Sequence, residues 1–208
     1  MTNSSLTWDR MKTNPLVFVV SGPSGVGKDA ILNRMKEMNS QLFFTTTITT
    51  RKKRSKEVEG KDYYFVSESE FKETMQSGGL LEWAKVYGNY YGVPRKHVKA
   101  ALEQGRDVII KVDIQGVKSI QEILPDAVFI MIMPPSAEEL SNRLSSRATE
   151  APADLALRLK TAEKELQQLI HFDYAVINHR NEIDSAVQDM MCIIRAEKCR
   201  VKDRHLVL

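Results

Sequence analysis

Residues 22–29 read Gly-Pro-Ser-Gly-Val-Gly-Lys-Asp, between an apolar run at residues 16–20 and a stretch with apolar residues at helical spacing. A strand, a glycine-rich loop, a lysine and a helix in this order form a cradle for phosphate groups. Glycines let backbone N–H groups turn inward, the helix start adds positive charge, and Lys28 supplies an ammonium group for the terminal phosphates. The octet therefore predicts a nucleoside triphosphate site.

The last position of the octet departs from the usual loop pattern, G-x-x-x-x-G-K-[ST]. Asp29 stands where a hydroxyl group normally helps to hold Mg²⁺. From these residues alone, two other interpretations stay open: an ordinary glycine-rich turn, and a loop that has lost its catalytic role. Residues farther along the chain bear on the choice.

Apolar runs alternate with helical patterns along the chain, which predicts an α/β fold with a parallel sheet covered by helices. Continuous apolar stretches are typical of strands buried on both faces. Apolar stripes predict a long helix over residues 155–169 and another over residues 183–194. The expected core strands are residues 16–20, 107–112, 127–133 and 174–177, with a fifth near residues 42–46.

The segment from residue 45 to residue 93 breaks this alternation. It is rich in Thr, Tyr, Lys and Arg, and strand-like pieces at residues 63–66, 82–87 and 90–91 are separated by turn residues. Capping-box patterns mark helix starts at Ser67 and at Ser136. We therefore expect a small, mostly antiparallel lobe inserted into the α/β core.

Composition restricts the class of protein. A chain of 208 residues suits one domain with small inserted lobes, and a net charge of +3 does not by itself indicate a nucleic-acid partner. No run is long and apolar enough to span a membrane, and the polar residues 1–14 predict a flexible tail without an export signal. Cys192 and Cys199 would lie about 10 Å apart along one helix, too far for a disulfide, which favours a cytoplasmic location.

A second anion site is indicated by Arg51 and Arg54, which are followed by Glu57 and Tyr63. Two guanidinium groups can bind a phosphate that is not part of the triphosphate, and a tyrosine hydroxyl can complete the site. Two alternatives remain open from this run alone: a solvated basic turn, and a patch that binds nucleic acid.

Together, these segments resemble the guanylate kinase family, in the family's order and over about residues 16 to 195. The matching pieces are the octet, Thr-Thr-Arg-Lys-Lys-Arg at 49–54, Glu-Val-Glu-Gly-Lys-Asp-Tyr-Tyr-Phe-Val at 57–66, Glu-Trp-Ala at 82–84, Gly-Asn-Tyr-Tyr-Gly at 88–92, Val-Asp-Ile-Gln-Gly-Val at 112–117, Pro-Pro-Ser at 134–136, and the arginines 143, 147 and 158.

The resemblance implies transfer of the γ-phosphoryl group of ATP to GMP, and to dGMP, giving ADP and GDP, with Mg²⁺ as cofactor. It also implies a P-loop nucleoside monophosphate kinase fold in which a five-stranded parallel core carries an antiparallel β GMP-binding lobe and a helical lid. The expected boundaries are 15–44, 94–135 and 160–208 for the core, 45–93 for the lobe and 136–159 for the lid. GMP and ATP are the expected partners, without nucleic acid or membrane.

The resemblance also implies roles for individual residues. ATP would contact Gly22, Pro23, Ser24, Gly25, Val26, Gly27, Lys28, Asp29 and Asn178; GMP would contact Thr47, Arg51, Arg54, Glu57, Tyr63, Glu82, Tyr91 and Asp113; catalysis would involve Lys28, Arg51, Arg143, Arg147 and Arg158; and Asp29 and Asp113 are candidate metal ligands. Glu82 has a chemical rationale, because a carboxylate accepts both the N1–H and N2–H of guanine but repels the N1 acceptor of adenine.

Three positions depart from the family's pattern: Asp29, Lys111 in place of the first acidic residue of an Asp-x-Asp strand end, and Val93 in place of a hydroxyl residue near guanine. The strand that carries Lys111 is expected beside the strand of the loop. We therefore expect Asp29 and Lys111 to form an ion pair, because an unpaired Asp29 would repel ATP phosphates. Binding of Mg²⁺ by Asp29, directly or through water, is the alternative.

Two other functions compete with the kinase assignment. A guanylate-kinase-like module that only binds protein partners could dispense with Lys28 and the lid arginines, which this chain retains. A kinase for another nucleoside monophosphate would share the loop but has no need for a carboxylate at Glu82.

Overall fold

The computed structural model describes residues 14–38, 41–55, 57–86, 88–145, 152–201, 204 and 206. Five parallel strands form the main sheet, and this confirms the α/β fold expected from the sequence. In order across the sheet they are β2 (Phe43–Phe44), β7 (Val108–Lys111), β1 (Val17–Ser21), β8 (Val128–Met133) and β9 (Tyr174–Ile177).

The central strand β1 is buried on both faces, since every one of its residues is inaccessible to solvent. Phe18 and Val20 pack in the cluster that includes helices α1 (Lys28–Met38) and α7 (Ile183–Lys198). Val17 and Val19 pack in the cluster of the opposite face, which includes α3 (Arg95–Glu103) and α4 (Ile114–Ile123). Alternation along one apolar strand therefore holds helical layers on both sides of the sheet.

A second sheet of four strands lies in the segment expected to form the inserted lobe. Its order is β4 (Tyr63–Phe65), β3 (Thr47–Thr49), β6 (Asn89–Pro94) and β5 (Leu80–Val86), with α2 (Glu68–Gln76) after β4 in the chain. The expectation of a mostly antiparallel lobe is confirmed, since the pairs β3–β6 and β5–β6 are antiparallel, while β3 and β4 run parallel. Residues 50–62 carry the chain back to the starting end of β3, a connection of the length that parallel neighbours need.

The helix ends agree with the signals in the sequence. Ser67 caps α2 in a complete capping box with Glu70, and the Ser136 hydroxyl accepts the N–H of Glu139 before α5 (Ala137–Ser145). One long helix was expected over residues 155–169, but α6 (Pro152–Leu166) ends earlier and tightens into a 3-10 turn, η2 (Gln167–His171). Such a turn commonly ends a helix, and it leads here directly into β9.

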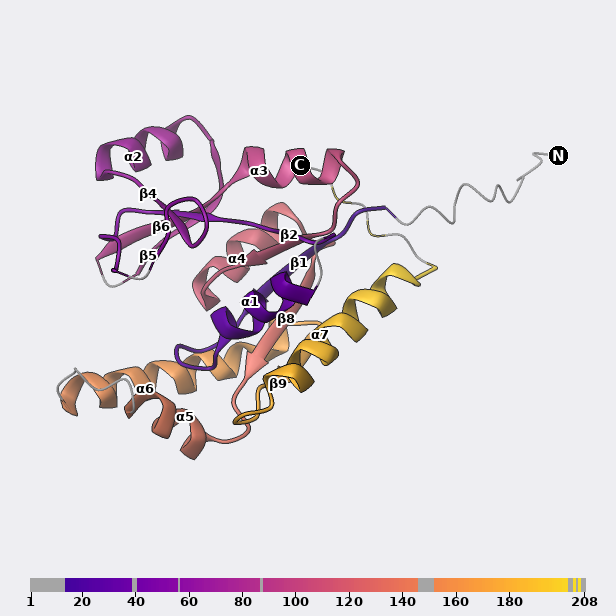
Figure 1. Ribbon diagram of the computed structural model, residues 1–208. Coiled ribbons are helices and arrows are strands. Elements are labelled where there is room, and N and C mark those ends of the chain that lie inside the picture. Colours follow the sequence, from indigo (N-terminus) through magenta and orange to yellow (C-terminus); the bar gives the residue numbers. More distant parts are fainter. Residues whose placement is uncertain are drawn as a thin grey trace.

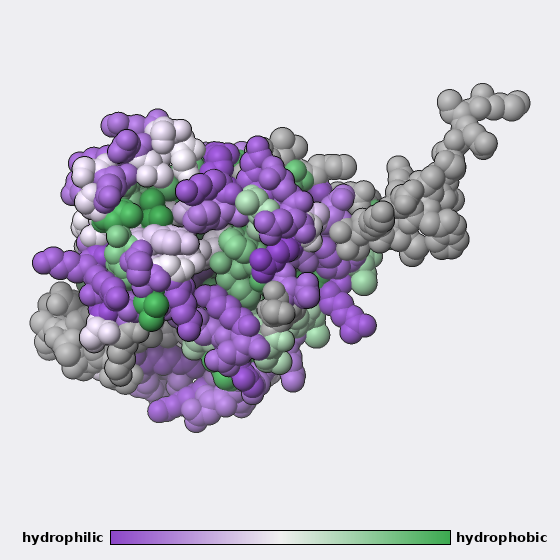
Figure 2. Space-filling view, turned by 45° about the horizontal axis from the view of Figure 1, so that its top comes forward, coloured by the Kyte–Doolittle hydropathy of each residue, from purple (hydrophilic) through white to green (hydrophobic). Residues whose placement is uncertain are grey.

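Figure 1 shows the second sheet and α2 on one side of the loop between β1 and α1, with α5 and α6 on the other side. The face drawn in Figure 2 is mainly polar, with apolar residues in small separate groups. None of the described helices is long and apolar enough to cross a membrane. The arrangement in Figure 1 puts the phosphate-binding loop between two outlying parts of the molecule.

Candidate active site

The loop between β1 and α1 passes close to the backbone of β8 at Gly22 and to the side chain of Asn178 at Gly27. A Cβ atom at Gly22 would lie 2.2 Å from the carbonyl oxygen of Ile132, and its φ is +148°. A Cβ atom at Gly27, whose φ is +95°, would lie 2.5 Å from the amide nitrogen of Asn178. A side chain at either position would push the loop away from the sheet.

Lys28 is the first residue of α1, and its ammonium group is held inside the loop. It donates hydrogen bonds to the carbonyl oxygens of Gly22 and Pro23, the latter at 3.1 Å. Burial lowers the pKa of Lys28 to about 8, although neighbouring carboxylates oppose the shift. An arriving phosphate would replace neutral carbonyl partners with charged ones and stabilise the ammonium form.

Side chains from three other elements fix the loop from the outside. The amide of Asn178, the residue after β9, donates to the carbonyl oxygen of Val26 at 2.7 Å. Arg143 on α5 donates to the carbonyl oxygens of Val26 and Asn178, and Arg158 on α6 donates to the Ser24 hydroxyl at 3.0 Å. Asn178 and two of the three expected lid arginines therefore gather at this loop, whereas Arg147 lies outside the described residues.

A cleft of about 460 Å³ joins the loop to the second sheet. It is lined by residues from the loop, from β5, β6 and β7, and from α6, among them Gly22, Ser24, Lys28, Thr47, Glu82, Val93, Asp113 and Glu165. A second cavity of about 250 Å³ contains Arg51, Arg54 and Glu57. The two cavities share Asp29, Thr47, Tyr63, Tyr91 and Lys111, so the two expected anion sites adjoin.

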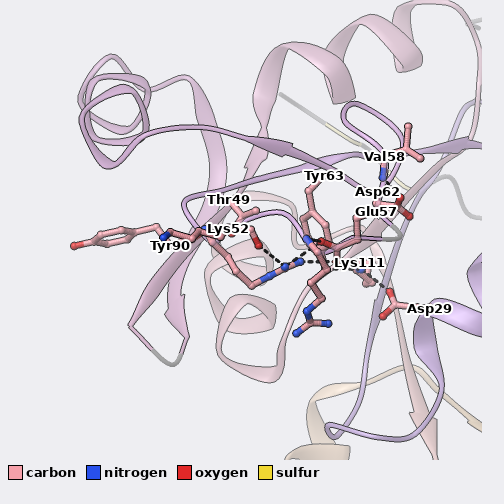
Figure 3. Close-up of polar contacts among 11 residues, drawn as sticks. Asp29, Thr49, Lys52, Glu57, Val58, Asp62, Tyr63, Tyr90 and Lys111 are labelled. Carbon is pink, nitrogen blue, oxygen red and sulfur yellow. Dashed lines mark hydrogen bonds and ion pairs between the residues drawn. The ribbon is translucent and has the colours of Figure 1, made fainter.

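Arg51 and Arg54, with the side chains around them, form a basic corner, in which Figure 3 labels Glu57 and Tyr63. The guanidinium group of Arg51 makes a bidentate pair with Glu57, at 2.7 and 3.0 Å, and lies 5.2 Å from the ring centroid of Tyr63. The hydrogen bonds with Glu57 raise the pKa of Arg51, and in turn the pKa of Glu57 lies below its usual value. Glu57 also accepts the backbone N–H of Arg54 at 2.8 Å. In this state the guanidinium group of Arg51 is already paired with a carboxylate, that of Glu57.

Glu82 lies at the other end of the cleft and is nearly buried, with 6% of its surface exposed. Its Oε1 atom has no hydrogen-bond partner among the described residues, and burial, followed by the charge of Asp113, raises its pKa to about 8. Val93 on β6 is the residue paired with Glu82 on β5, and it offers no hydroxyl group. A buried carboxyl group that lacks a partner is costly unless a ligand supplies donors.

Helix α4 closes the site beside Glu82. Asp113 is the N-cap of α4, and its carboxylate accepts the backbone N–H of Gly116 at 2.8 Å. A Cβ atom at Gly116 would lie 2.5 Å from Oε1 of Glu82, so only glycine leaves room for this carboxyl group. Asp113 thus has a capping role that the sequence did not indicate.

The ion pair expected between Asp29 and Lys111 is confirmed, with 2.6 Å between Oδ1 and Nζ. Its cause is the topology of the sheet: Val20 near the end of β1 pairs with Lys111 at the end of β7. Parallel strands end at the same edge, so Lys111 lies next to the loop after β1. The Nζ atom also donates to the hydroxyl of Tyr63 at 3.3 Å.

Glu165 is a cleft residue that the sequence did not indicate. It lies on α6 near Lys28 and accepts the backbone N–H of Ser24, while its Oε2 atom is buried without a partner among the described residues. Burial raises the pKa of Glu165, and the charge of Lys28 opposes this shift. Its position three residues after the buried Ala162, on the inner side of the helix, was the available signal.

Comparisons with known proteins agree with this geometry. The guanylate kinase family model matches residues 12–197. The guanylate kinase of Caldanaerobacter subterraneus subsp. tengcongensis is 45% identical over 94% of this chain and 96% of its own, and that of Syntrophomonas wolfei is 41% identical over 94% and 100%. A crystal structure of guanylate kinase from Anaplasma phagocytophilum superposes with a TM-score of 0.76, at 33% identity, over 92% of this chain and 90% of that one. The chain therefore belongs to the guanylate kinase family.

Proposed function

We propose that this chain transfers the γ-phosphoryl group of ATP to GMP, giving ADP and GDP, and to dGMP, giving ADP and dGDP, across the cleft between Lys28 and the basic corner. The observation that carries the proposal is the shared lining of the two cavities, which brings a P-loop and a two-arginine site to one space. A phosphoryl group can pass directly between two such sites.

The donor side would bind ATP through the backbone N–H groups of residues 22–29, with Lys28 on the terminal phosphates and Asn178 toward the base. The acceptor side would bind the GMP phosphate through Arg51, Arg54 and the hydroxyls of Tyr63 and Tyr91. The phosphate of GMP is already anionic, so in-line positioning and positive charge suffice for catalysis. No general base is assigned.

Guanine would be bound at the other end of the cleft. The Glu82 carboxylate would accept the N1–H and N2–H of guanine, and Thr47 would lie near O6. The orphaned Oε1 of Glu82 supports this assignment, because the two donors would supply the partners that it lacks.

Two parts are proposed to close over bound nucleotides: residues 45–93 as the GMP-binding lobe and residues 136–159 as the lid, around a core of residues 15–44, 94–135 and 160–208. Arg143, Arg147 and Arg158 would then surround the moving phosphoryl group. Closure is expected because water in the cleft would hydrolyse ATP.

The cleft also fits the Mg²⁺ ion that such a reaction uses. Mg²⁺ takes oxygen ligands, usually one or two carboxylates together with substrate phosphates and water. Asp113 and Glu165 line the same cleft as Lys28, and Oε2 of Glu165 is a buried oxygen without a partner among the described residues. Asp113 would hold the ion, which would neutralise charge on the ATP phosphates, whereas Asp29 is already paired with Lys111.

The proposed compartment is the cytoplasm, where exposed thiols such as Cys192 and Cys199 stay reduced. The proposed partners are GMP and ATP, without nucleic acid or membrane.

A coupled assay of ADP release tests the function. Purified chain and ATP are incubated with GMP, dGMP, AMP, CMP or UMP, with and without Mg²⁺. We expect rapid ADP release with GMP and dGMP only, and only with Mg²⁺, with GDP as the second product. ADP release that is equal without any acceptor would identify a plain ATPase, and no release at all would support the binding-module alternative.

Protonation of Glu82 predicts how GMP affinity changes with pH. The raised pKa, about 8, means that the carboxyl group of the free protein is mostly protonated near neutral pH, whereas guanine requires the carboxylate. GMP binding should therefore release close to one proton near neutral pH, and affinity should rise from about pH 6 to about pH 8 and then level off.

Titration calorimetry in two buffers of different ionisation enthalpy measures this proton release. The variant Glu82→Gln is the control, because it has no carboxyl group to titrate. Proton release that is the same in both proteins would assign the effect to another group.

A further inference from the structure

We propose that Lys111 is a catalytic residue that contacts the phosphoryl group as it passes between ATP and GMP, and that Asp29 is the positioning residue that holds it there. This inference rests on the proposed function. It places a cation, the ammonium group of Lys111, between the two phosphate sites.

The contacts of Lys111 connect the two sites. Its Nζ atom lies 2.6 Å from Oδ1 of Asp29, the residue after the loop lysine, and 3.3 Å from the hydroxyl of Tyr63. The ring of Tyr63 is in turn 5.2 Å from the guanidinium carbon of Arg51 and 5.0 Å from Nζ of Lys111. One ammonium group is thus within contact distance of the donor loop and of a residue of the basic corner (Figure 3).

Lys111 is also positioned rigidly. It is the last residue of β7, whose preceding residues are buried in the core, and its side chain is only 24% exposed. Lys111 lines both cavities. The group is an ammonium ion in its pair with Asp29 and donates to the hydroxyl of Tyr63.

Two ammonium groups, those of Lys28 and Lys111, line the same cleft. Asp29, the ion-pair partner of Lys111, directly follows Lys28, so both lysines are anchored at the start of α1. Asp29 balances only one of these two charges, and an anion in the cleft can contact both ammonium groups. A phosphoryl group in transit, with charge on its three outer oxygens, is an anion of the required kind.

The transfer step needs no proton from Lys111. An oxygen of the GMP phosphate forms a bond to the γ-phosphorus, and the bond from that phosphorus to the bridging oxygen breaks, with its electron pair leaving on ADP. Lys111 remains protonated and stays beside the charge as it moves. A fixed cation whose contact is stronger in the transition state than in the ground state raises kcat rather than affinity.

The test compares Lys111→Met, Lys111→Arg, Asp29→Asn and the double variant Asp29→Asn/Lys111→Met. Lys111→Met should lower kcat by about 100-fold, with the KM for ATP changed less than about 3-fold. Lys111→Arg should have a kcat about 10-fold higher than that of Lys111→Met, because arginine restores the positive charge. Asp29→Asn should lower kcat by about 10-fold, and the double variant should be no better than Lys111→Met.

Lys72→Met is the matched control, because Lys72 forms an ion pair of the same length with Glu68, 2.6 Å, on α2. It should keep wild-type kcat. The melting temperature of each variant is measured alongside, and Lys111→Met should melt within a few degrees of wild type, since the pair is partly exposed.

Two outcomes would overturn the proposal. Activity near wild type in the double variant would mean that Lys111 only neutralises Asp29. A larger loss for Asp29→Asn than for Lys111→Met, with a raised half-saturating Mg²⁺ concentration, would assign Asp29 to the metal instead. If the wild-type chain forms no GDP, the proposed function itself is wrong. The wild-type assay therefore tests the function, and the comparison of the variants with the wild type tests the role of Lys111.

Discussion

Replacing Lys28 by methionine should lower kcat for GDP formation by about 1,000-fold or more. The ammonium group is held within the loop by the carbonyl oxygens of Gly22 and Pro23, so it is already in place when phosphates arrive. The methionine side chain has a volume similar to that of lysine but carries no charge. The terminal phosphates of ATP would then lack the cation nearest to them. The measurement is single-turnover transfer from labelled ATP to GMP.

The matched control is Lys118→Met, which removes the same charge from an exposed position on α4. It should keep wild-type turnover. Because Lys28 is partly buried, each variant is also tested for binding of GMP alone. GMP affinity within about 3-fold of wild type would show that the acceptor side remains folded. A Lys28→Met protein with more than about a tenth of wild-type kcat would contradict the donor-loop assignment.

Replacing Glu82 by glutamine should lower kcat/KM for GMP by about 100- to 1,000-fold, with ATP binding unchanged. An amide has one acceptor instead of two, and its NH₂ group faces the donors of guanine. Activity with AMP should not fall, so the ratio of GMP to AMP activity should drop by a similar factor. Kinetics with both acceptors measure this ratio.

Glu73→Gln is the control for this substitution, since Glu73 lies on α2 in the same part of the chain and outside the cleft lining. Gly116→Ala tests the same site independently, because its Cβ would meet the Glu82 carboxyl group at 2.5 Å. Alanine favours the helix, so this variant should be stable yet impaired with GMP only. Equal losses with GMP and AMP in either variant would contradict recognition of guanine by Glu82.

The core sheet was predictable because its signal is local. Continuous apolar runs such as residues 128–132 fit only a strand covered on both faces, and the glycine loop marks the end of β1 and the start of α1. The ion pair between Asp29 and Lys111 was predictable because strand order alone brings the two residues to one edge. In each case the inference needed one residue pattern and one rule of topology.

Other features depend on contacts that no local pattern shows. Strand β3 has threonines at both ends around a single isoleucine, and it is extended because β4 and β6 pair with it. Glu165 has the sequence context of an ordinary surface acid on a helix, and only the packing of α6 against the loop buries one of its oxygens. The hydrogen bonds between Glu57 and Arg51 could not be predicted, because Glu57 was expected to contact GMP rather than the arginine.

The bidentate pair of Arg51 with Glu57 has a consequence for small anions. A carboxylate only six residues away acts as a tethered competitor, because the short connection keeps it at a high effective concentration beside the arginine. Simple anions therefore gain little by displacing it, whereas a nucleotide that is also held at its base brings additional binding energy to the exchange. The empty enzyme is in this way protected from inhibition by the inorganic ions that surround it.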